Sequence, residues 1–177
     1  MFLQDMEVTM EIERKWMVSG WPEDLPLLET FCMDQGYISV RPTVRIRREA
    51  LQGGKTSLIL CFKGAAQSHG LSRQEIEREI DEEFFAQLEE LIGLELIHKE
   101  RRTYLLADGH HLEVNLVDPD LPCSFMYAEI EYASEEEALS WDPASCHLED
   151  YLERDCTGEP GSTMGEYWLQ TKELRGV

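Results

Sequence analysis

Hydrophobic and charged positions alternate along residues 10–18 of this 177-residue chain, MEIERKWMV. In an extended strand, successive side chains point to opposite faces of the sheet. One face of this segment then carries Glu11, Glu13 and Lys15, whereas the residues between them are mostly apolar. Such a strand can bury its apolar face while it directs two carboxylates and an ammonium group to the other side.

The same alternation recurs along the chain, and one segment follows the helical period instead. Strands are expected over residues 7–18, 34–40, 42–50, 56–64, 71–80, 96–106, 110–117 and 126–134. Residues 81–93 predict a helix, with Asp81 as its N-cap and Gly93 at its C-terminal end. The segment 20–31 contains Pro22 and Pro26, and we expect a loop there with a short helical turn.

From about residue 135 onward the pattern becomes acidic and mainly helical. No repeat or linker divides the chain, so residues 1–177 are expected to form a single domain. About eight strands joined mostly by hairpins, followed by helices, predict an α+β arrangement. The sheet would be mainly antiparallel, open or closed into a barrel, with helices packed on the outside.

Charge and cysteine content narrow the classes of partner. The formal net charge is −20, which argues against nucleic acid and against an anionic membrane surface as partners. It still allows a small anion in a local basic pocket. The chain has five cysteines, an odd number, and no Cys-x-x-Cys motif. This pattern favours reduced thiols in a cytoplasmic protein. No signal segment and no apolar run of membrane-spanning length is visible.

The charged faces of the expected strands are almost purely Glu, Lys and Arg. A strand with one charged face is usually half of a solvated sheet, but such sheets commonly carry Thr, Ser and Gln as well. The sorting of acids and bases therefore favours a closed barrel with a charged lumen. The acids are Glu11, Glu13, Glu75, Glu77, Glu113, Glu129 and Glu131. The bases are Lys15, Arg45, Arg47, Lys63, Arg73, Lys99 and Arg101.

This set of side chains predicts a metal ion and a polyanion in one channel. The pairs Glu11/Glu13 and Glu129/Glu131 come from separate strands and can converge on a hard divalent cation such as Mg²⁺ or Mn²⁺. So many cations would repel one another unless a multiply charged anion lay among them, and a polyphosphate chain meets that requirement.

The order and spacing of these motifs resemble the CYTH superfamily, the triphosphate tunnel metalloenzymes. The resemblance covers about residues 10–132 and rests on EIERK, RIR, LCFKG, LSRQEIE, KERR, LEVN and AEIEY. It implies an eight-stranded antiparallel tunnel that processes triphosphate compounds with a divalent metal. Metal binding is then implied for Glu11, Glu13, Glu129 and Glu131. Phosphate binding is implied for Lys15, Arg45, Arg47, Lys63, Arg73 and Arg101, with Glu75, Glu77 and Glu113 as additional tunnel acids.

The resemblance also implies that Tyr37 and Lys99 help to activate water. We therefore expect hydrolysis of a small triphosphate, with inorganic triphosphate first. A class IV adenylyl cyclase, a thiamine-triphosphatase, a nucleoside triphosphatase and a non-catalytic polyphosphate- or nucleotide-binding module stay open, as does a homodimer. Family members often end in a Tyr-Ser-Asn-like motif, and here that region reads GSTMGEYWLQ without the Asn.

Overall fold

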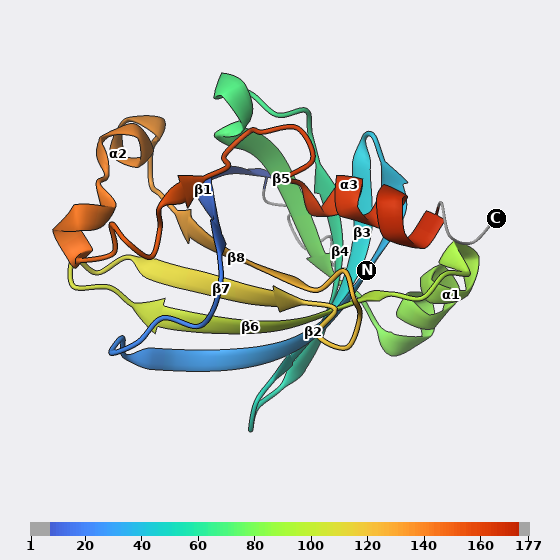
Figure 1. Ribbon diagram of the computed structural model, residues 1–177. Helices are drawn as coiled ribbons and strands as arrows, with labels where there is room; N and C mark the ends of the chain where they lie inside the picture. The colour runs from blue at the N-terminus through green and yellow to red at the C-terminus, as the bar shows by residue number, and fades with distance from the viewer. Residues whose placement is uncertain (1–7, 174–177) are drawn as a thin grey trace.

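A closed antiparallel β-barrel makes up most of the computed structural model, which describes residues 8–173 (Figure 1). The first strand, β1, spans Val8–Val18, and its order around the barrel is β1-β5-β4-β3-β2-β6-β7-β8, returning to β1. The other barrel strands are β2 (Leu27–Val40), β3 (Thr43–Leu51), β4 (Thr56–Lys63), β5 (Ser72–Glu79), β6 (Ile97–Leu105), β7 (His111–Val117) and β8 (Phe125–Glu131). The expected α+β fold with an eight-stranded barrel is confirmed.

The barrel closes through β1, which pairs with different strands along its length. Its first half pairs with β5, where Glu11 lies opposite Arg73. Its second half pairs with β8, where Glu13 lies opposite Glu131 and Lys15 opposite Glu129. A two-residue strand, β9 (Arg154–Asp155), adds to the free edge of β1. This closure brings the two Glu-x-Glu segments into register with each other.

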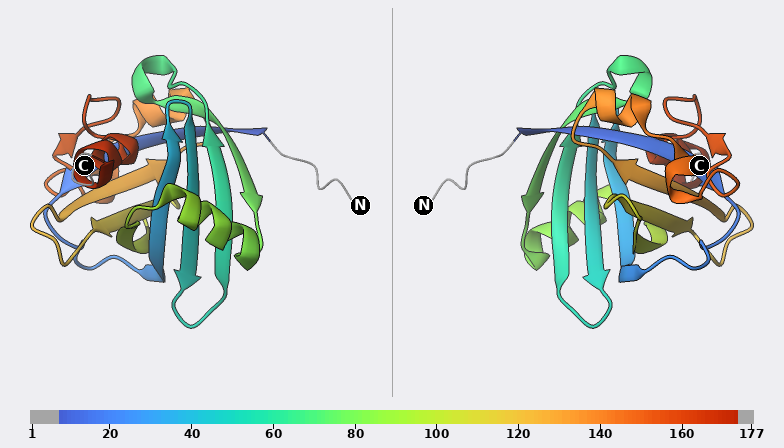
Figure 2. Two further views of the ribbon diagram at one scale, coloured as in Figure 1. Left: turned by 90° about the vertical axis from the view of Figure 1, so that its right-hand side faces the viewer. Right: turned by 90° about the vertical axis from the view of Figure 1, so that its left-hand side faces the viewer.

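The helices cover the outside and the ends of the barrel. Helices α1 (Glu82–Ile92) and α2 (Glu135–Ser140) lie at opposite ends of the molecule (Figure 1). Helix α1 begins and ends where the sequence predicts: the Asp81 side chain accepts a hydrogen bond from Phe84 N, and Gly93 is left-handed with φ 64°. Figure 2 shows α1 lying against the outer side of the strands.

The segment after residue 135 was expected to be mainly helical, but its described part, up to residue 173, contains only short helices and helical turns. After α2 come a 3₁₀ turn, η2 (Pro143–Cys146), then helix α3 (Met164–Trp168) and a π-helical turn, η3 (Leu169–Glu173). Irregular chain and β9 lie between them. A further 3₁₀ turn, η1 (Ser68–Gly70), precedes β5. Among the described residues, no helix is long and apolar enough to cross a membrane.

The apolar faces of the strands point outward and are buried in two clusters. One lies around Trp16 and Ile130 and is covered by α2 and η2. The other lies around Ile46 and Ile97 and is covered by α1 and α3 through Phe85 and Trp168. Because successive strand residues alternate, this outward burial leaves the charged positions facing the lumen.

One expectation is wrong: residues 27–31 do not form a loop with a helical turn. They are the first part of β2, and Leu27 pairs with Tyr104 of β6. Pro26 immediately precedes the strand, where the missing N–H costs no ladder bond. The strand there is specified by a partner about 75 residues away, which local patterning does not report. Residue 7, the first of the expected N-terminal strand, lies outside the described residues.

Candidate active site

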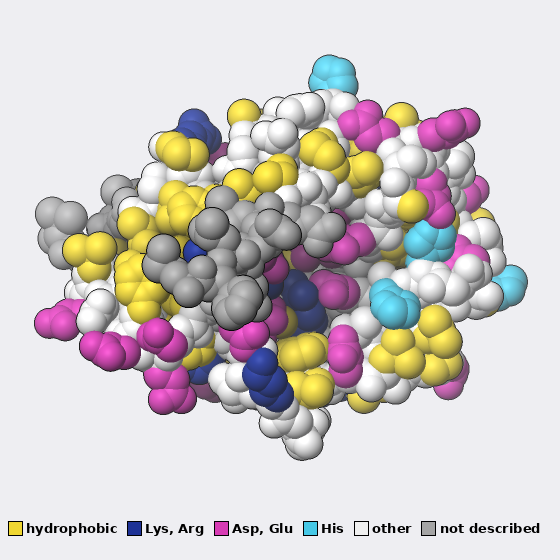
Figure 3. Space-filling view, turned by 180° about the vertical axis from the view of Figure 1, so that it is seen from behind, with side chains coloured by type: hydrophobic (Ala, Val, Ile, Leu, Met, Phe, Trp, Pro, Cys, Tyr) yellow, Lys and Arg dark blue, Asp and Glu magenta, His cyan; other side chains and the backbone are white. Residues whose placement is uncertain are grey.

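A cavity of about 860 Å³ occupies the barrel interior. Every charged residue proposed from the alternating pattern lines it, together with Tyr37. In the space-filling view from behind, basic and acidic side chains lie side by side in the hollowed middle of that face (Figure 3). The acids contributed by the strands are Glu11, Glu13, Glu75, Glu77, Glu113, Glu129 and Glu131. The bases are Lys15, Arg45, Arg47, Lys63, Arg73, Lys99 and Arg101.

Three carboxylates converge where β1 meets β8. One oxygen from each of Glu11, Glu13 and Glu131 lies within 4.8 Å of the others. Glu129, the fourth predicted ligand, lies outside this group and pairs with the Lys15 ammonium, at 3.4 Å. The site therefore offers a three-carboxylate cluster with Glu129 next to it.

The charge state of this cluster reflects burial first, and then the charges that surround each carboxylate. Burial, together with the charges of Glu129 and Glu11, raises the pKa of Glu13 to about 7. Burial and the charge of Glu113 raise the pKa of Glu131 to about 6, although its exposed side chain leaves that effect open to screening by solvent. Burial opposes ionisation of Glu11 too, but Lys63 and Arg73 outweigh it and lower its pKa to about 2.

A divalent cation suits this donor set. The cluster contains oxygen ligands only, which is the preference of Mg²⁺ and Mn²⁺. A cation would also relieve the repulsion that keeps the pKa of Glu13 high. The residues present therefore fit a metal ion held by Glu11, Glu13 and Glu131.

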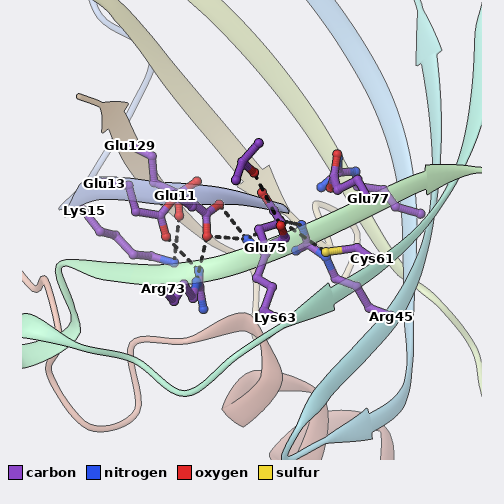
Figure 4. A network of polar contacts seen from close by, with 12 residues as sticks. Glu11, Glu13, Lys15, Arg45, Cys61, Lys63, Arg73, Glu75, Glu77 and Glu129 are labelled. Atoms are coloured by element: carbon purple, nitrogen blue, oxygen red, sulfur yellow. Dashed lines mark hydrogen bonds and ion pairs between the residues drawn. The ribbon is translucent and has the colours of Figure 1, made fainter. Parts of the chain in front are cut away.

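The basic side chains are held by carboxylates of neighbouring strands. Figure 4 shows Glu11 between Lys63 and Arg73: Lys63 Nζ donates to both of its oxygens at 2.6 and 2.7 Å, and Arg73 Nε donates to one at 2.7 Å. On the neighbouring strands, Arg47 Nη2 of β3 donates to Glu77 of β5 at 3.1 Å. Arg101 Nη1 lies 2.8 Å from Glu113.

Some buried donors in the lumen keep unused hydrogen-bonding capacity. Within the described residues, Arg45 Nε and Asn115 Nδ2 have no hydrogen-bond partner. Leaving a buried donor unpaired costs free energy, about 1–3 kcal/mol each. Unpaired donors on a cationic wall are what an anion with many oxygens would satisfy.

Lys99 is fully enclosed, and its hydrogen bond goes to an unexpected phenol. Its Nζ donates to Tyr127 Oη at 3.1 Å. Burial and the neighbouring Arg101 guanidinium hold the pKa of Lys99 well below its usual range. Tyr37 lies in the same lumen, but within the described residues no hydrogen bond joins it to Lys99. Its hydroxyl accepts from Gln35 Nε2 at 2.7 Å.

Four further residues lie on the inward strand faces and were not predicted from the sequence. They are Gln35, Glu49, Cys61 and Tyr127. Gln35 also accepts from Arg45 at 3.3 Å, Glu49 lies 2.6 Å from Arg47 Nε, and the Cys61 thiol donates to Glu75 at 3.2 Å. All four stand two positions from a residue that was identified, on the same face of its strand, so the alternation itself could have found them.

The C-terminal segment closes one side of the cavity. Residues 157–160 and 162–166 line it, including the first residues of α3. A Cβ on Gly165 would lie 2.9 Å from Val40 of β2, so this helix approaches the barrel closely. The backbones at Gly158 and Gly70 also approach each other closely, since a Cβ on Gly70 would lie 2.4 Å from Gly158 Cα. The segment GSTMGEYWLQ therefore contributes part of the cavity wall.

Comparison with characterised proteins points to one functional class. The chain is 32% identical over 143 residues to the inorganic triphosphatase of Nitrosomonas europaea, a match that covers 81% of this chain and 89% of the relative. No family model matches the chain.

Solved structures share the fold. The inorganic triphosphatase NE1496 matches with a TM-score of 0.57 and 23% identity, over 89% of this chain and 93% of that one. PH1819 from Pyrococcus horikoshii matches with a TM-score of 0.57 and 19% identity, over 81% and 88%. HpAC1 from Hippeastrum, a protein with a dominant triphosphatase activity, matches with a TM-score of 0.56 and 17% identity, over 80% and 87%.

Proposed function

Since this chain belongs to the triphosphate tunnel metalloenzymes of the CYTH superfamily, we propose that it is a hydrolase that cleaves inorganic triphosphate to pyrophosphate and phosphate. The observation that carries the proposal is the lumen itself, where a three-carboxylate cluster faces a wall of buried Lys and Arg side chains. The 32% identity to an inorganic triphosphatase over most of both chains supports the same substrate.

Mg²⁺ or Mn²⁺ is the proposed cofactor, held by Glu11, Glu13 and Glu131, with Glu129 next to them. When bound, a divalent cation supplies charge neutralisation for the phosphate oxygens. The carboxylates of the chain fix where that charge sits, and Lys63 and Arg73 keep Glu11 ionised so that it is ready to bind.

The basic wall is proposed to bind and orient the phosphates. Arg45, Arg47 and Arg101 offer planar guanidinium groups, which bind phosphate oxygens in pairs, whereas Lys15 and Lys63 offer point charges. Their present carboxylate partners, such as Glu77 for Arg47, would exchange for phosphate oxygens. Glu75, Glu77 and Glu113 then act as partners of Lys63, Arg47 and Arg101 rather than as metal ligands.

Lys99 is the proposed general base. A base must be neutral to accept a proton, and burial together with the neighbouring Arg101 favours the neutral amine of Lys99. The amine would take a proton from the attacking water while the terminal phosphoryl group is transferred to that water and pyrophosphate leaves. Tyr37, held by Gln35, is proposed to orient the water or the phosphate it attacks.

The test is a product assay across substrates. Phosphate release is measured from inorganic triphosphate, ATP and thiamine triphosphate with Mg²⁺ and with Mn²⁺, alongside a cyclic-AMP assay. We expect the highest kcat/KM with inorganic triphosphate, and no release in excess chelator. Cyclic-AMP formation that exceeds phosphate release, or binding of triphosphate without turnover, would overturn the proposal.

The protein is also proposed to work in the cytoplasm, without a nucleic-acid or membrane partner. All five cysteines are free thiols, and the net charge of −20 disfavours polyanionic surfaces. A homodimer stays a prediction that a sedimentation measurement would decide.

A further inference from the structure

Tyr127 occupies the point in the lumen where two lysines from different strands meet. Its side chain is 1% exposed, on the inward face of β8 two residues before Glu129. The Lys15 ammonium lies 3.7 Å from the centre of its ring. The Lys99 ammonium donates to its hydroxyl at 3.1 Å. One aromatic side chain therefore contacts the lysine beside the acidic cluster and the proposed base.

We propose that Tyr127 is a positioning residue for triphosphate hydrolysis: its hydroxyl fixes the direction of the Lys99 amine, and its ring face holds the Lys15 ammonium. This inference rests on the proposed function. Within the described residues, the Lys99 ammonium donates its hydrogen bond to the Tyr127 hydroxyl. This contact therefore sets where the long, flexible lysine side chain points. A catalytic group displaced by about 1 Å can lose roughly a hundredfold in rate.

A neutral phenol is well suited to this place. Burial and the nearby Arg101, Arg45 and Arg47 favour the neutral amine of Lys99, whereas the Glu129 carboxylate opposes them. A carboxylate as the direct partner would add to that opposition and favour the charged lysine, which cannot act as a base. A phenol orients the amine without adding a charge. The ring face, in contrast, attracts a cation, which suits Lys15 because that side chain acts as an ammonium group next to Glu129.

The tyrosine is itself held firmly from the C-terminal side. Phe125, two residues earlier on the same face, stacks on it with 6.0 Å between ring centres. Tyr167 packs on Phe125 at 5.1 Å and donates to the buried Asp118 at 2.8 Å. The ring of Tyr127 therefore has little freedom to move, which a positioning role requires.

Two substitutions separate the two contacts. Tyr127→Phe keeps the ring and removes the hydroxyl, so we expect kcat to fall by roughly tenfold to a hundredfold with KM nearly unchanged. Tyr127→Leu also removes the ring, so KM for inorganic triphosphate should rise as well. The matched control is Tyr132→Phe, because that buried hydroxyl has no hydrogen-bond partner within the described residues and lies in the apolar cluster around Trp16 and Ile130. It should leave both constants unchanged.

A second readout needs no turnover. In the proton NMR spectrum of the substrate-free protein, the ring should shift the Lys15 side-chain methylene signals upfield. That shift should persist in Tyr127→Phe and vanish in Tyr127→Leu, whereas the Lys99 signals should move in both. Parent-like kcat in Tyr127→Phe, or Lys15 signals at ordinary positions in the parent, would overturn the inference. If the Leu variant fails to fold, the Phe variant decides alone. A parent without triphosphatase activity would instead overturn the proposed function.

Discussion

Glu13 combines two properties that oppose each other: it is placed to bind metal, and its environment disfavours its charge. Burial and the charges of Glu129 and Glu11 raise its pKa from 4.5 to about 7. Above pH 7 the metal-free folded protein would therefore hold an ionised carboxylate in an unfavourable place. Between about pH 4.5 and 7 the folded state binds more protons than the unfolded state, so this group makes stability fall as pH rises.

Replacing Glu13 with glutamine should therefore abolish activity and stabilise the metal-free protein. The amide of the new side chain would keep an oxygen to accept from Arg73 Nη2, now 2.9 Å from Glu13, and would remove the charge. In excess chelator at pH 8, we expect the free energy of unfolding to rise by about 1–3 kcal/mol, because each unit of pKa shift corresponds to about 1.36 kcal/mol. The gain should shrink through pH 7 and vanish below about 4.5, where the carboxyl group is already protonated. Denaturant unfolding across this range measures it.

Glu79→Gln provides the control, since Glu79 is an exposed residue at the end of β5 that pairs with Lys55. It should change neither metal-dependent activity nor the pH dependence of stability. A Glu13→Gln protein with full activity at limiting metal would remove Glu13 from the metal site.

Lys99 makes a prediction about the pH dependence of the rate. Its pKa is held well below 10.5 by burial and by Arg101, so the neutral amine appears as pH rises through that lowered value. We expect kcat to rise with pH along this limb and then to level off, and Lys99→Ala to lose turnover by about 10²–10⁴-fold with KM little changed. Tyr37→Phe should also lower kcat more than it changes KM. Steady-state kinetics at saturating metal measure both. If Lys99→Ala raises only KM, Lys99 is a phosphate clamp.

At the level of elements, most of the barrel was predictable because each strand carries its own alternation. The face of β1 with Glu11, Glu13 and Lys15 could be identified from period two alone, because its other face is buried by helices. Helix α1 was predictable for a similar reason, since Asp81 and Gly93 define its ends. The first five residues of β2 were not, because pairing with β6, and at Phe31 also with β3, makes them a strand.

The contacts within the lumen were less predictable than its composition. The alternation places Lys99 and Tyr37 in one tunnel, but which phenol reaches Lys99 depends on register and on the direction of each side chain. In the structure, the Lys99 ammonium donates to the hydroxyl of Tyr127. Likewise, Glu129 shares a face with Glu131, yet the pairing of Lys15 with Glu129 leaves it outside the three-carboxylate cluster.

The loop that closes the cavity depends on two glycines that cross. Gly70 has φ +94°, and a Cβ there would collide with Gly158 Cα at 2.4 Å. Gly109, in the β6–β7 turn, has the same φ of +94° but open space around it. Gly70→Ala and Gly109→Ala therefore carry the same backbone strain, of order 1–3 kcal/mol, and differ in the collision.

We expect Gly109→Ala to lower stability and leave KM unchanged. Gly70→Ala should lower stability further and raise KM for inorganic triphosphate, because residues 157–160 and 162–166 would move away from the cavity they line. Thermal unfolding and steady-state kinetics measure the two effects. Equal KM values in the two variants would mean that this loop does not contribute to substrate binding.

At the scale of the whole molecule, folding separates the charges unevenly. The chain has 16 Lys and Arg residues against 36 Asp and Glu, yet half of the basic residues line the cavity. The outer surface is therefore strongly acidic, while the lumen holds acids and bases in similar numbers. Assembling so many cations in one low-dielectric channel opposes folding, and their pairing with Glu11, Glu77 and Glu113 offsets only part of that cost.

This distribution predicts that the protein is stabilised most by metal and polyanion together. An unreactive triphosphate analogue at about 100 times its Kd with Mg²⁺ adds about 2.7 kcal/mol of stability. For a protein of this size, that corresponds to a Tm rise of roughly 5–10 °C. Arg45→Ala should reduce the rise, because the analogue loses a guanidinium whose Nε has no hydrogen-bond partner among the described residues. Arg78→Ala, at an exposed position on the outer face of β5, should leave it intact. Calorimetry with metal alone, analogue alone and both separates the contributions. Equal rises in the two arginine variants would place the anion outside the barrel, because Arg45 lines the cavity and Arg78 does not.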